Sequence, residues 1–262
     1  MTPMTGTVYI VGAGPGAADL LTLKAAALLA RAAAVLHDDL VPREILDLVS
    51  PAAELINVGK RCGRHGSSQE QINRLMVVHA RRGRPVVRLK SGDPSVFGRL
   101  GEELDALREA EVPFEIVPGV TAATAAAAAA HATLTDRRLA SALVVLTGHR
   151  RDGAQDDSLM PRPEQATYAV YMPGPDYSAT ARELLRSGLD ADTPCALVSK
   201  AGRGDQKVYR LRLGQLHAHA PVPAPAILIV GEVTAVAAES ADVSDVPVAG
   251  LIYEAATDCA IS

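Results

Sequence analysis

The sequence predicts an α/β fold made of two domains. Short apolar segments that suit buried strands alternate with helix-forming segments, and many of the apolar segments end in glycine or proline. Four or five such strand–helix units before residue 118 indicate a parallel, doubly wound sheet. In the second half, five apolar segments accompany one clear helix, which favours a mixed sheet. We therefore expect an N-terminal α/β domain over 1–118, a C-terminal α/β domain over 119–240 and a tail over 241–262.

The composition limits the classes of function. At 262 residues with 48% apolar content, the chain can build packed cores, and a net charge of −4 argues against a dedicated nucleic-acid binder. The three cysteines and the histidines lack metal-ligand spacing, so we expect reduced thiols and no metal. No apolar run approaches the ~18 residues of a membrane span, and no signal peptide is evident. These features predict a cytoplasmic globular protein that binds neither nucleic acid nor membrane.

The first strand and its glycine loop resemble the dinucleotide-binding fingerprint. A strand over 7–11 is followed by Gly12-Ala13-Gly14-Pro15-Gly16-Ala17, and a helix over 20–33 then begins after Asp19, which we expect to cap it. A nicotinamide-dependent oxidoreductase is therefore one candidate function. Pro15 argues against it, because proline removes a backbone N–H from the loop that would bind a pyrophosphate.

The loop Ser91-Gly92-Asp93-Pro94 is the strongest candidate for ligand binding. It ends an apolar strand over 85–89, and ligands bind at the carboxyl edge of the strands in open α/β sheets. Asp93 can accept hydrogen bonds from a ribose or an amine, and Gly92 lets a ligand approach the backbone closely. Alternatively, Asp93 closes a tight turn through an Asx-type hydrogen bond. Turn chemistry alone supports the two interpretations about equally.

The remaining elements follow from the same patterns. Ser67 and Glu70 form a capping-box pattern at the start of a helix that ends near Arg82. The alanine-rich segment 121–130 is strongly helix-forming, and we expect a buried interdomain helix and linker over 119–135. Further strands are expected over 34–36, 55–58, 114–117, 142–146, 167–172, 194–199, 208–213 and 226–230, further helices over 102–109 and 179–187, and a mobile surface loop over 148–163.

Nine short motifs, in order along the chain, carry a resemblance to a known family. They are VGAGPG (11–16), HDDLV (37–41), VGKR (58–61), RLKSGDP (88–94), VFGRLGEE (96–103), VPGVT (117–121), LTDR (134–137), TGH (147–149) and VYM (170–172). Together they resemble the tetrapyrrole methylases over about residues 6–235. The resemblance implies two α/β domains with S-adenosyl-L-methionine (SAM) in the cleft between them, usually in a homodimer.

The same resemblance implies a reaction. Methyl transfer from SAM to C2 and C7 of the tetrapyrrole uroporphyrinogen III would give precorrin-2, for sirohaem or cobalamin biosynthesis, with S-adenosyl-L-homocysteine as the other product. A later precorrin intermediate is the alternative substrate. A module that binds SAM without catalysis is the non-enzymatic alternative.

The resemblance also implies roles for matching residues. Asp38 is implied as proton acceptor and Lys60 as donor, with Arg99 and Glu102 as a second catalytic pair. A guanidinium hardly deprotonates, so we expect Arg99 to bind a substrate carboxylate and Glu102 to orient it. Arg137 matches the family's substrate-binding arginine, and arginine suits the carboxylates of uroporphyrinogen. Cofactor contacts are implied at Pro15, Ser91, Gly92, Asp93, Val96, Thr121, Ala122, Met172 and Ala201.

Three positions depart from the family's pattern. Ser91 stands where the central loop (residues 91–94) usually has glycine, and Ser95 stands where a bulkier residue is common. Asp136 replaces a usual histidine and places an acid beside Arg137. We expect Asp136 either to orient Arg137 or to repel substrate carboxylates.

Overall fold

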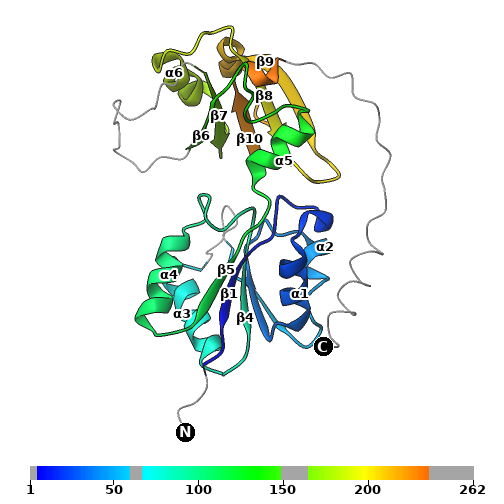
Figure 1. The fold of residues 1–262 in the computed structure, drawn as a ribbon, viewed down its shortest axis with the longest axis vertical. Helices are drawn as coiled ribbons and strands as arrows, with labels where there is room; N and C mark the ends of the chain where they lie inside the picture. The colour runs from blue at the N-terminus through cyan, green and yellow to red at the C-terminus, as the bar shows by residue number, and fades with distance from the viewer. Residues whose placement is uncertain (1–4, 60–66, 149–164, 236–262) are drawn as a thin grey trace. The chain divides into compact units, whose positions relative to one another are not determined.

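The chain forms two compact units. The computed structural model describes residues 5–59, 67–148 and 165–235 (Figure 1). The first unit ends at Thr121 and the second begins at Ala122, slightly after the boundary expected at residue 118. The predicted tail and most of the predicted surface loop lie outside the described residues. Within the described ranges, no helix has the length and apolar character needed to cross a membrane.

The first unit contains a five-stranded parallel sheet, as the sequence predicts. Its order is β3-β2-β4-β1-β5, and every pairing is parallel. Strand β4 lies at the centre of the sheet and is buried at every residue, so it lies in the middle of this unit's core. The strands are β1 (Val8–Gly12), β2 (Ala34–His37), β3 (Glu54–Asn57), β4 (Val86–Lys90) and β5 (Phe114–Val117).

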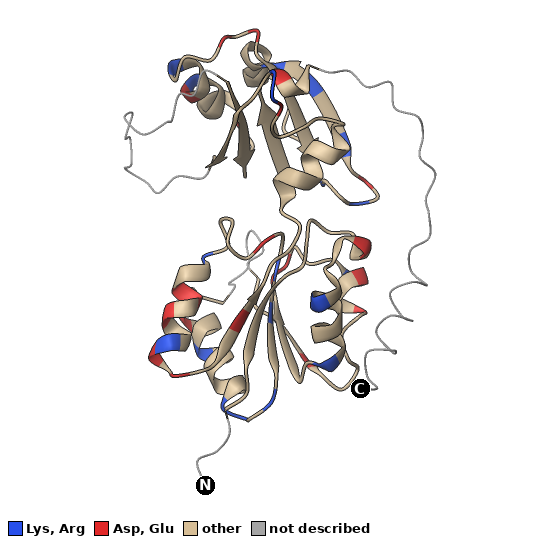
Figure 2. Ribbon diagram, in the orientation of Figure 1, with Lys and Arg blue, Asp and Glu red and all other residues tan. Residues whose placement is uncertain are grey.

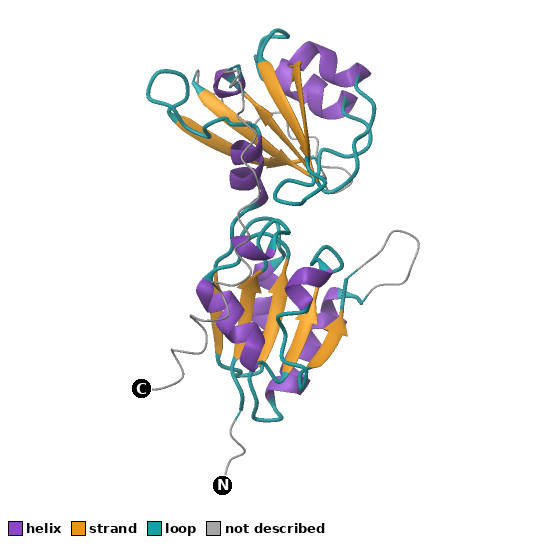
Figure 3. Cartoon of the chain, turned by 90° about the vertical axis from the view of Figure 1, so that its right-hand side faces the viewer, coloured by secondary structure: helices purple, strands orange, loops and turns teal. Residues whose placement is uncertain are grey.

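Helices cover both faces of this sheet (Figures 1 and 3). Helices α1 (Leu23–Arg31) and α2 (Arg43–Leu46) pack on one face, against Val87 and other apolar residues. Helices α3 (Gln69–Ala80) and α4 (Leu100–Glu109) pack on the other. Side chains alternate between the faces of a strand, so β4 supplies apolar residues to both layers.

The strand order places a topological switch point between β2 and β4. These strands are neighbours, but the chain leaving β2 continues outward to β3, whereas the chain leaving β4 continues to β5 at the opposite edge. In open α/β sheets the crevice at the carboxyl ends of two such strands is the usual ligand site. The residues that follow β2 and β4 are therefore the strongest candidates for ligand binding.

The second unit contains a mixed sheet, again as predicted. Its order is β6-β7-β10-β8-β9, in which only β6 and β7 pair in parallel. Helix α6 (Ser178–Arg186) packs on the face that carries Leu228. The strands are β6 (Ala142–Thr147), β7 (Ala166–Tyr171), β8 (Pro194–Ser199), β9 (Lys207–Arg212) and β10 (Ala226–Val230).

The alanine-rich segment forms helix α5 (Ala122–Ala129), which packs against β10. Its buried residues include Ala126, which is fully inaccessible, whereas Thr124 and Ala128 are exposed, so burial is confirmed for one side of the helix. The helix carries no charged residue, as Figure 2 shows. At its carboxyl end the Arg210 guanidinium donates to the Ala130 carbonyl at 2.5 Å. Its position between domains stays a prediction.

Two predicted helix caps are wrong, and one helix was not predicted. Asp19 lies inside a short 3-10 turn, and Thr22 caps α1 by accepting a hydrogen bond from Ala25 N. The capping box of α3 is formed by Ser68 and Gln71, one residue later than expected, because the helix begins at Gln69. The short helix α2 (Arg43–Leu46) was not predicted, and Pro42 is its N-cap.

Candidate functional site

The glycine loop after β1 is bonded to the central loop after β4. Gly14 and Gly92 form a two-way bridge, with N–H to carbonyl distances of 3.2 Å and 2.7 Å, and Ala13 N donates to Lys90 O at 2.7 Å. These N–H groups are thus committed to the neighbouring loop. The next α-helix begins only at Leu23, so its N-terminus does not open from the glycine loop. The Ala13 and Gly14 amides and the N-terminus of α1 are therefore not placed to bind a pyrophosphate, and the nicotinamide interpretation loses this geometric support.

Three glycines let the ends of β1, β4 and β5 meet through their backbones. A Cβ on Gly12 would lie 2.6 Å from Gly119 N, and a Cβ on Gly119 would lie 2.4 Å from Gly92 O. Both distances are too short for a side chain. Gly92 itself has a φ of +70°, and no described atom lies within 4 Å of a Cβ built there. The central loop therefore leaves open space directly over its backbone, as a ligand-binding loop requires.

Asp93 closes this loop. Its Oδ1 accepts from Ser95 N at 2.8 Å and from the Ser95 hydroxyl, and its Oδ2 accepts from Gly119 N at 3.0 Å. Burial raises the pKa of Asp93, but the hydrogen bonds from Ser95 and Gly119 outweigh it and hold that pKa below its usual range. The Asx-type turn interpretation is confirmed. The same carboxylate ties the β4 loop to the β5 loop, while its contact with a cofactor stays a prediction.

A chain of four charged side chains lies at the switch point. Asp38 follows β2, and its Oδ1 accepts from Arg88 Nη2 at 2.6 Å. Arg88 Nε donates to Glu103 Oε1 at 2.9 Å, and Lys90 Nζ donates to both Glu103 oxygens at 2.9 Å. Glu103 is fully buried and Arg88 is 3% exposed. Burial opposes the charge on Arg88, but Asp38 and Glu103 together raise its pKa above the ordinary value.

Three residues of this charged chain, Arg88, Lys90 and Glu103, were not predicted as site residues from the sequence. One signal was available: two cations stand at alternate positions of a strand that is otherwise apolar and buried. Alternation places them on the face that α4 covers, and Glu103 lies in the first turn of that helix. A buried cation needs a buried partner, so the pattern indicates an acidic residue on the covering helix.

Arg99 and Glu102 form a bidentate ion pair. Arg99 Nε donates to Glu102 Oε1 at 2.7 Å, and Nη2 donates to Oε2 at 2.6 Å. Both side chains are about half exposed, at 53% and 51%. The hydrogen bonds that Arg99 donates to Glu102 raise the pKa of Arg99, so a role as a base is unfavourable. Arg99 is the N-cap of α4 with a φ of +54°, and that helix presents Glu102 outward and Glu103 inward.

The predicted cofactor residues of the first unit follow the carboxyl ends of three adjacent strands. Pro15 and the 91–93 segment lie in the loops after β1 and β4, which are bonded together. Val96 N donates to Asp93 O at 3.2 Å in the same turn, and Thr121 follows β5. The structure thus gathers this part of the predicted set at one sheet edge.

The predicted cofactor residues of the second unit are also gathered at one edge. Met172 and Ala201 follow β7 and β8, which both run antiparallel to β10 and so end at the same side. Met172 has a φ of +48° and is 46% exposed, whereas Ala201 is buried. Ala122 begins α5, and the next amide, Ala123 N, donates to the Tyr171 hydroxyl at 3.1 Å. Tyr171 therefore links the start of α5 to the segment that carries Met172.

A family model of the Tetrapyrrole (Corrin/Porphyrin) Methylases matches residues 7–217. The chain belongs to the tetrapyrrole methylase family. The match spans both units and includes every predicted site residue, so it covers the two sheet edges described above.

Other tetrapyrrole methylases and their relatives agree with this assignment. The chain is 46% identical over 231 residues to siroheme synthase 1 of Klebsiella pneumoniae, covering 87% of this chain and 49% of that protein. It thus spans about half the length of the curated relatives it matches. The crystal structure of uroporphyrin-III-C-methyltransferase from Thermus thermophilus matches with a TM-score of 0.74 and 40% identity, over 88% of this chain and 95% of that one.

Two further structures bear on ligand and substrate. The Thermus thermophilus enzyme complexed with S-adenosyl homocysteine matches with a TM-score of 0.74 and 39% identity, over 88% of this chain and 99% of that one. A cobalt precorrin-4 methyltransferase matches with a TM-score of 0.73 but only 29% identity, over 87% and 95% of the two chains.

Two of the three departures from the tetrapyrrole methylase pattern, Asp136 and Ser95, have local structural roles. Asp136 bonds Arg138, not Arg137, with Nε and Nη2 at 3.1 Å and 3.0 Å from its two oxygens. The expectation that Asp136 orients Arg137 is therefore wrong. Arg138 lowers the pKa of Asp136 to about 2, and Arg137 is exposed. Ser95 supplies the amide and hydroxyl that bond Asp93.

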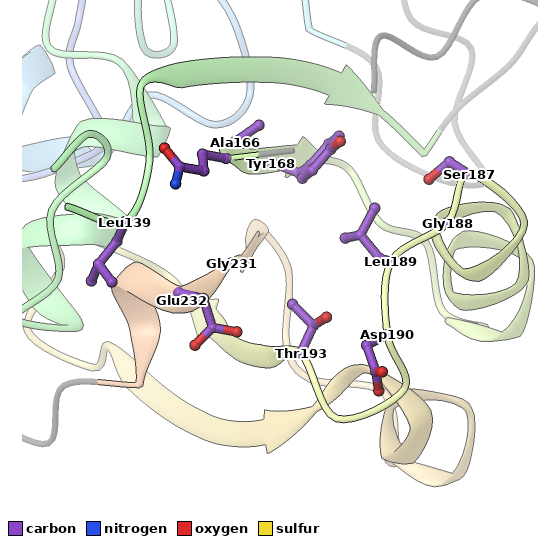
Figure 4. A pocket seen from close by; sticks show the side chains of 11 residues that line it. Leu139, Ala166, Tyr168, Ser187, Gly188, Leu189, Asp190, Thr193, Gly231 and Glu232 are labelled. Atoms are coloured by element: carbon purple, nitrogen blue, oxygen red, sulfur yellow. The ribbon is translucent and has the colours of Figure 1, made fainter. Parts of the chain in front are cut away.

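Some predicted residues lie elsewhere. Lys60, the predicted proton donor, lies outside the described residues. A pocket of about 490 Å³ in the second unit lies at the amino end of β7, beside Tyr168 and Glu232 (Figure 4). Met172 follows the opposite end of that strand, and none of the predicted site residues lines this pocket. Among the described parts of the chain, no cluster of His, Cys, Asp or Glu is arranged to hold a metal.

Proposed function

We propose that this chain is a SAM-dependent C-methyltransferase that methylates uroporphyrinogen III at C2 and C7 to give precorrin-2. The observation that carries the proposal is the placement of Asp38 after β2 and of the open backbone of Gly92 after the neighbouring strand β4, at the switch point of the parallel sheet. The 40% identity to a uroporphyrin-III-C-methyltransferase of matching fold supports the substrate.

The residues present suit SAM better than a dinucleotide. Open space over Gly92 admits a cofactor close to the backbone, whereas the Ala13 and Gly14 amides already donate to the neighbouring loop and Pro15 has no amide N–H for a pyrophosphate. When bound, SAM supplies an electrophilic methyl group. We propose that it contacts Pro15, Ser91, Gly92, Asp93, Val96 and Thr121 in the first unit and Ala122, Met172 and Ala201 in the second.

Asp38 is the proposed general base. Methylation of a pyrrole carbon releases a proton as the conjugated system rearranges, and a positioned carboxylate can accept it. Asp38 is 30% exposed, so it is accessible while one of its oxygens is held by Arg88. Lys60 is the proposed proton donor. Correct alignment of base and pyrrole contributes to rate by proximity.

Arg99 and Arg137 are the proposed ligands of substrate carboxylates. Both are exposed, and a guanidinium matches a carboxylate with two parallel hydrogen bonds. Glu102 already fixes the Arg99 fork, which supports its role as the orienting partner. The proposal includes a homodimeric, cytoplasmic enzyme whose product serves sirohaem or cobalamin synthesis.

The test is to incubate the purified protein with SAM and uroporphyrinogen III and to count added methyl groups by mass spectrometry. We expect two. Methyl transfer to a later precorrin but not to uroporphyrinogen III would favour the alternative that the cobalt precorrin-4 methyltransferase represents.

Calorimetry gives an independent check on the cofactor. S-adenosylhomocysteine should bind in the micromolar range or tighter, which corresponds to roughly −8 kcal/mol. NAD should not bind measurably. Tight binding of NAD with no measurable binding of S-adenosylhomocysteine would contradict the proposed SAM-dependent activity.

A further inference from the structure

We infer that Arg88 is a positioning residue that acts through Asp38, and that Glu103 and Lys90 hold Arg88 in place for this purpose. The inference rests on the proposed function and adds to it three buried residues that contact neither substrate nor cofactor in that proposal.

Burying four charged side chains costs free energy. Asp38, Arg88, Glu103 and Lys90 carry two negative and two positive charges, and the last three are almost inaccessible to solvent. Removing such charges from water offsets most of their mutual attraction, so apolar replacements of buried ion pairs are often neutral or stabilising. Stability alone is therefore a weak reason for two cations in the apolar strand β4.

Hydrogen bonds on several sides hold the Arg88 guanidinium in place. Its Nη1 donates to the carbonyls of Leu89, at 3.1 Å, and Leu36, at 3.4 Å, while Nε donates to Glu103. The two carbonyls belong to β4 and β2, the strands that form the switch point. The guanidinium thus has a fixed position between them, and its remaining nitrogen, Nη2, presents hydrogens to Asp38.

Glu103 and Lys90 fix the side of Arg88 that faces away from Asp38. Glu103 Oε1 accepts from both Arg88 and Lys90, so one buried carboxylate separates two cations. Lys90 Nζ bonds both Glu103 oxygens, which fixes the carboxylate plane against which Arg88 is aligned. Removing either residue would leave an uncompensated buried charge and would let Arg88 move.

The position of Arg88 in turn fixes the Asp38 carboxylate. Arg88 is the only described residue whose side chain bonds the Asp38 carboxylate, and it bonds one oxygen. The carboxylate is thereby anchored on the protein side and stays accessible on the other. A base must be held within a fraction of an ångström of its productive position, and misplacement by about 1 Å can cost ~10²-fold in rate. The anchor is therefore worth more to kcat than to binding.

The test combines Arg88→Lys with Asp38→Ala. Arg88→Lys keeps the buried positive charge but cannot bond Glu103, the carbonyls and Asp38 together. We expect kcat to fall ~10²-fold, with KM and S-adenosylhomocysteine affinity changed by less than about threefold. In the Asp38→Ala background the same substitution should have almost no further effect on kcat, because residues that act as a unit are not additive.

Arg82→Lys is the matched control. Arg82 also donates to a carboxylate, that of Glu54 at 3.1 Å, but it precedes β4 at the opposite end of the sheet. We expect wild-type kcat from it. The inference would be overturned if kcat of the double variant fell by the product of the two single-variant losses. It would also be overturned if the loss of kcat in Arg88→Lys only followed the folded fraction measured by thermal unfolding. Absence of methyl transfer in the wild-type protein would instead overturn the proposed function, and the role of Arg88 with it.

Discussion

Replacing Asp93 with alanine should loosen the central loop and destabilise the first unit. The substitution removes the acceptor of the Gly119 amide, a partly buried charge-assisted bond of 3.0 Å, and two exposed bonds to Ser95. A hydrogen bond to a charged group contributes ~1.5–3 kcal/mol, and the exposed bonds contribute less. We therefore expect Asp93→Ala to lower the free energy of unfolding by ~2–3 kcal/mol.

Two other variants separate the contributions. Ser95→Ala keeps both carboxylate–amide bonds and removes only an exposed hydroxyl, so it should cost ~0.5 kcal/mol. Asp93→Asn either turns an amide NH₂ group toward Gly119 N or loses the Ser95 bond, so it should cost ~1–3 kcal/mol. Urea unfolding gives the free energies, and hydrogen exchange read by mass spectrometry over the β5–α5 junction reports on the Gly119 amide.

The pH dependence has a definite sign. The folded-state pKa of Asp93 lies below the ordinary value of about 3.8, so its stabilisation is present above that pH and is lost as pH falls through the lowered pKa. The difference between wild type and Asp93→Ala should shrink there. A loss of stability in Asp93→Ala no larger than that in Ser95→Ala, or unchanged hydrogen exchange at Gly119 in Asp93→Ala, would contradict this role of Asp93.

Three further predictions use other parts of the chain. Ala126→Leu should overpack α5 and cost ~1–3 kcal/mol, while Ala128→Leu on the exposed side of the same helix should be nearly neutral; equal melting temperatures would contradict this burial. Arg137→Ala should mainly raise KM, by about tenfold to a hundredfold, whereas Arg99→Lys should also lower kcat, with S-adenosylhomocysteine binding intact in both; a pure kcat defect in Arg137→Ala would count against its role. Burial lowers the pKa of His79, so the unfolded chain takes up a proton more readily than the fold, and stability should fall as pH drops below about 6.5; His79→Gln should remove this slope, measured as melting temperature against pH.

The sequence predicted strand positions well because apolar segments bounded by glycine or proline have few other uses. The bounds of β5, β8 and β10 match those expected. The helix starts were less certain: Ser67 and Ser68 are equally suited to capping, and only the path of the chain selects Ser68. Local chemistry alone does not fix that path.

The buried charges could not be predicted in the same way. Arginine, lysine and glutamate are normally exposed, so a reading of single residues assigns them to the surface. The partnership of Asp38 with Arg88 depends on β2 lying beside β4, a neighbourhood created by the strand order and not by proximity in the chain. Family resemblance supplied Asp38 but not the residues that hold it.

Helix α5 has alanines where most helices have interlocking side chains. Alanine loses almost no side-chain entropy on folding, so the helix forms at low cost, but each buried methyl group makes fewer contacts with β10 than a larger side chain would. Its position must then be set at its ends, by the Tyr171 hydroxyl on Ala123 N and by Arg210 on Ala130 O. Tyr171 also immediately precedes Met172 in the chain. The Tyr171 phenol therefore holds the amino end of α5 and links Ala122, which begins that helix, to the segment that carries Met172.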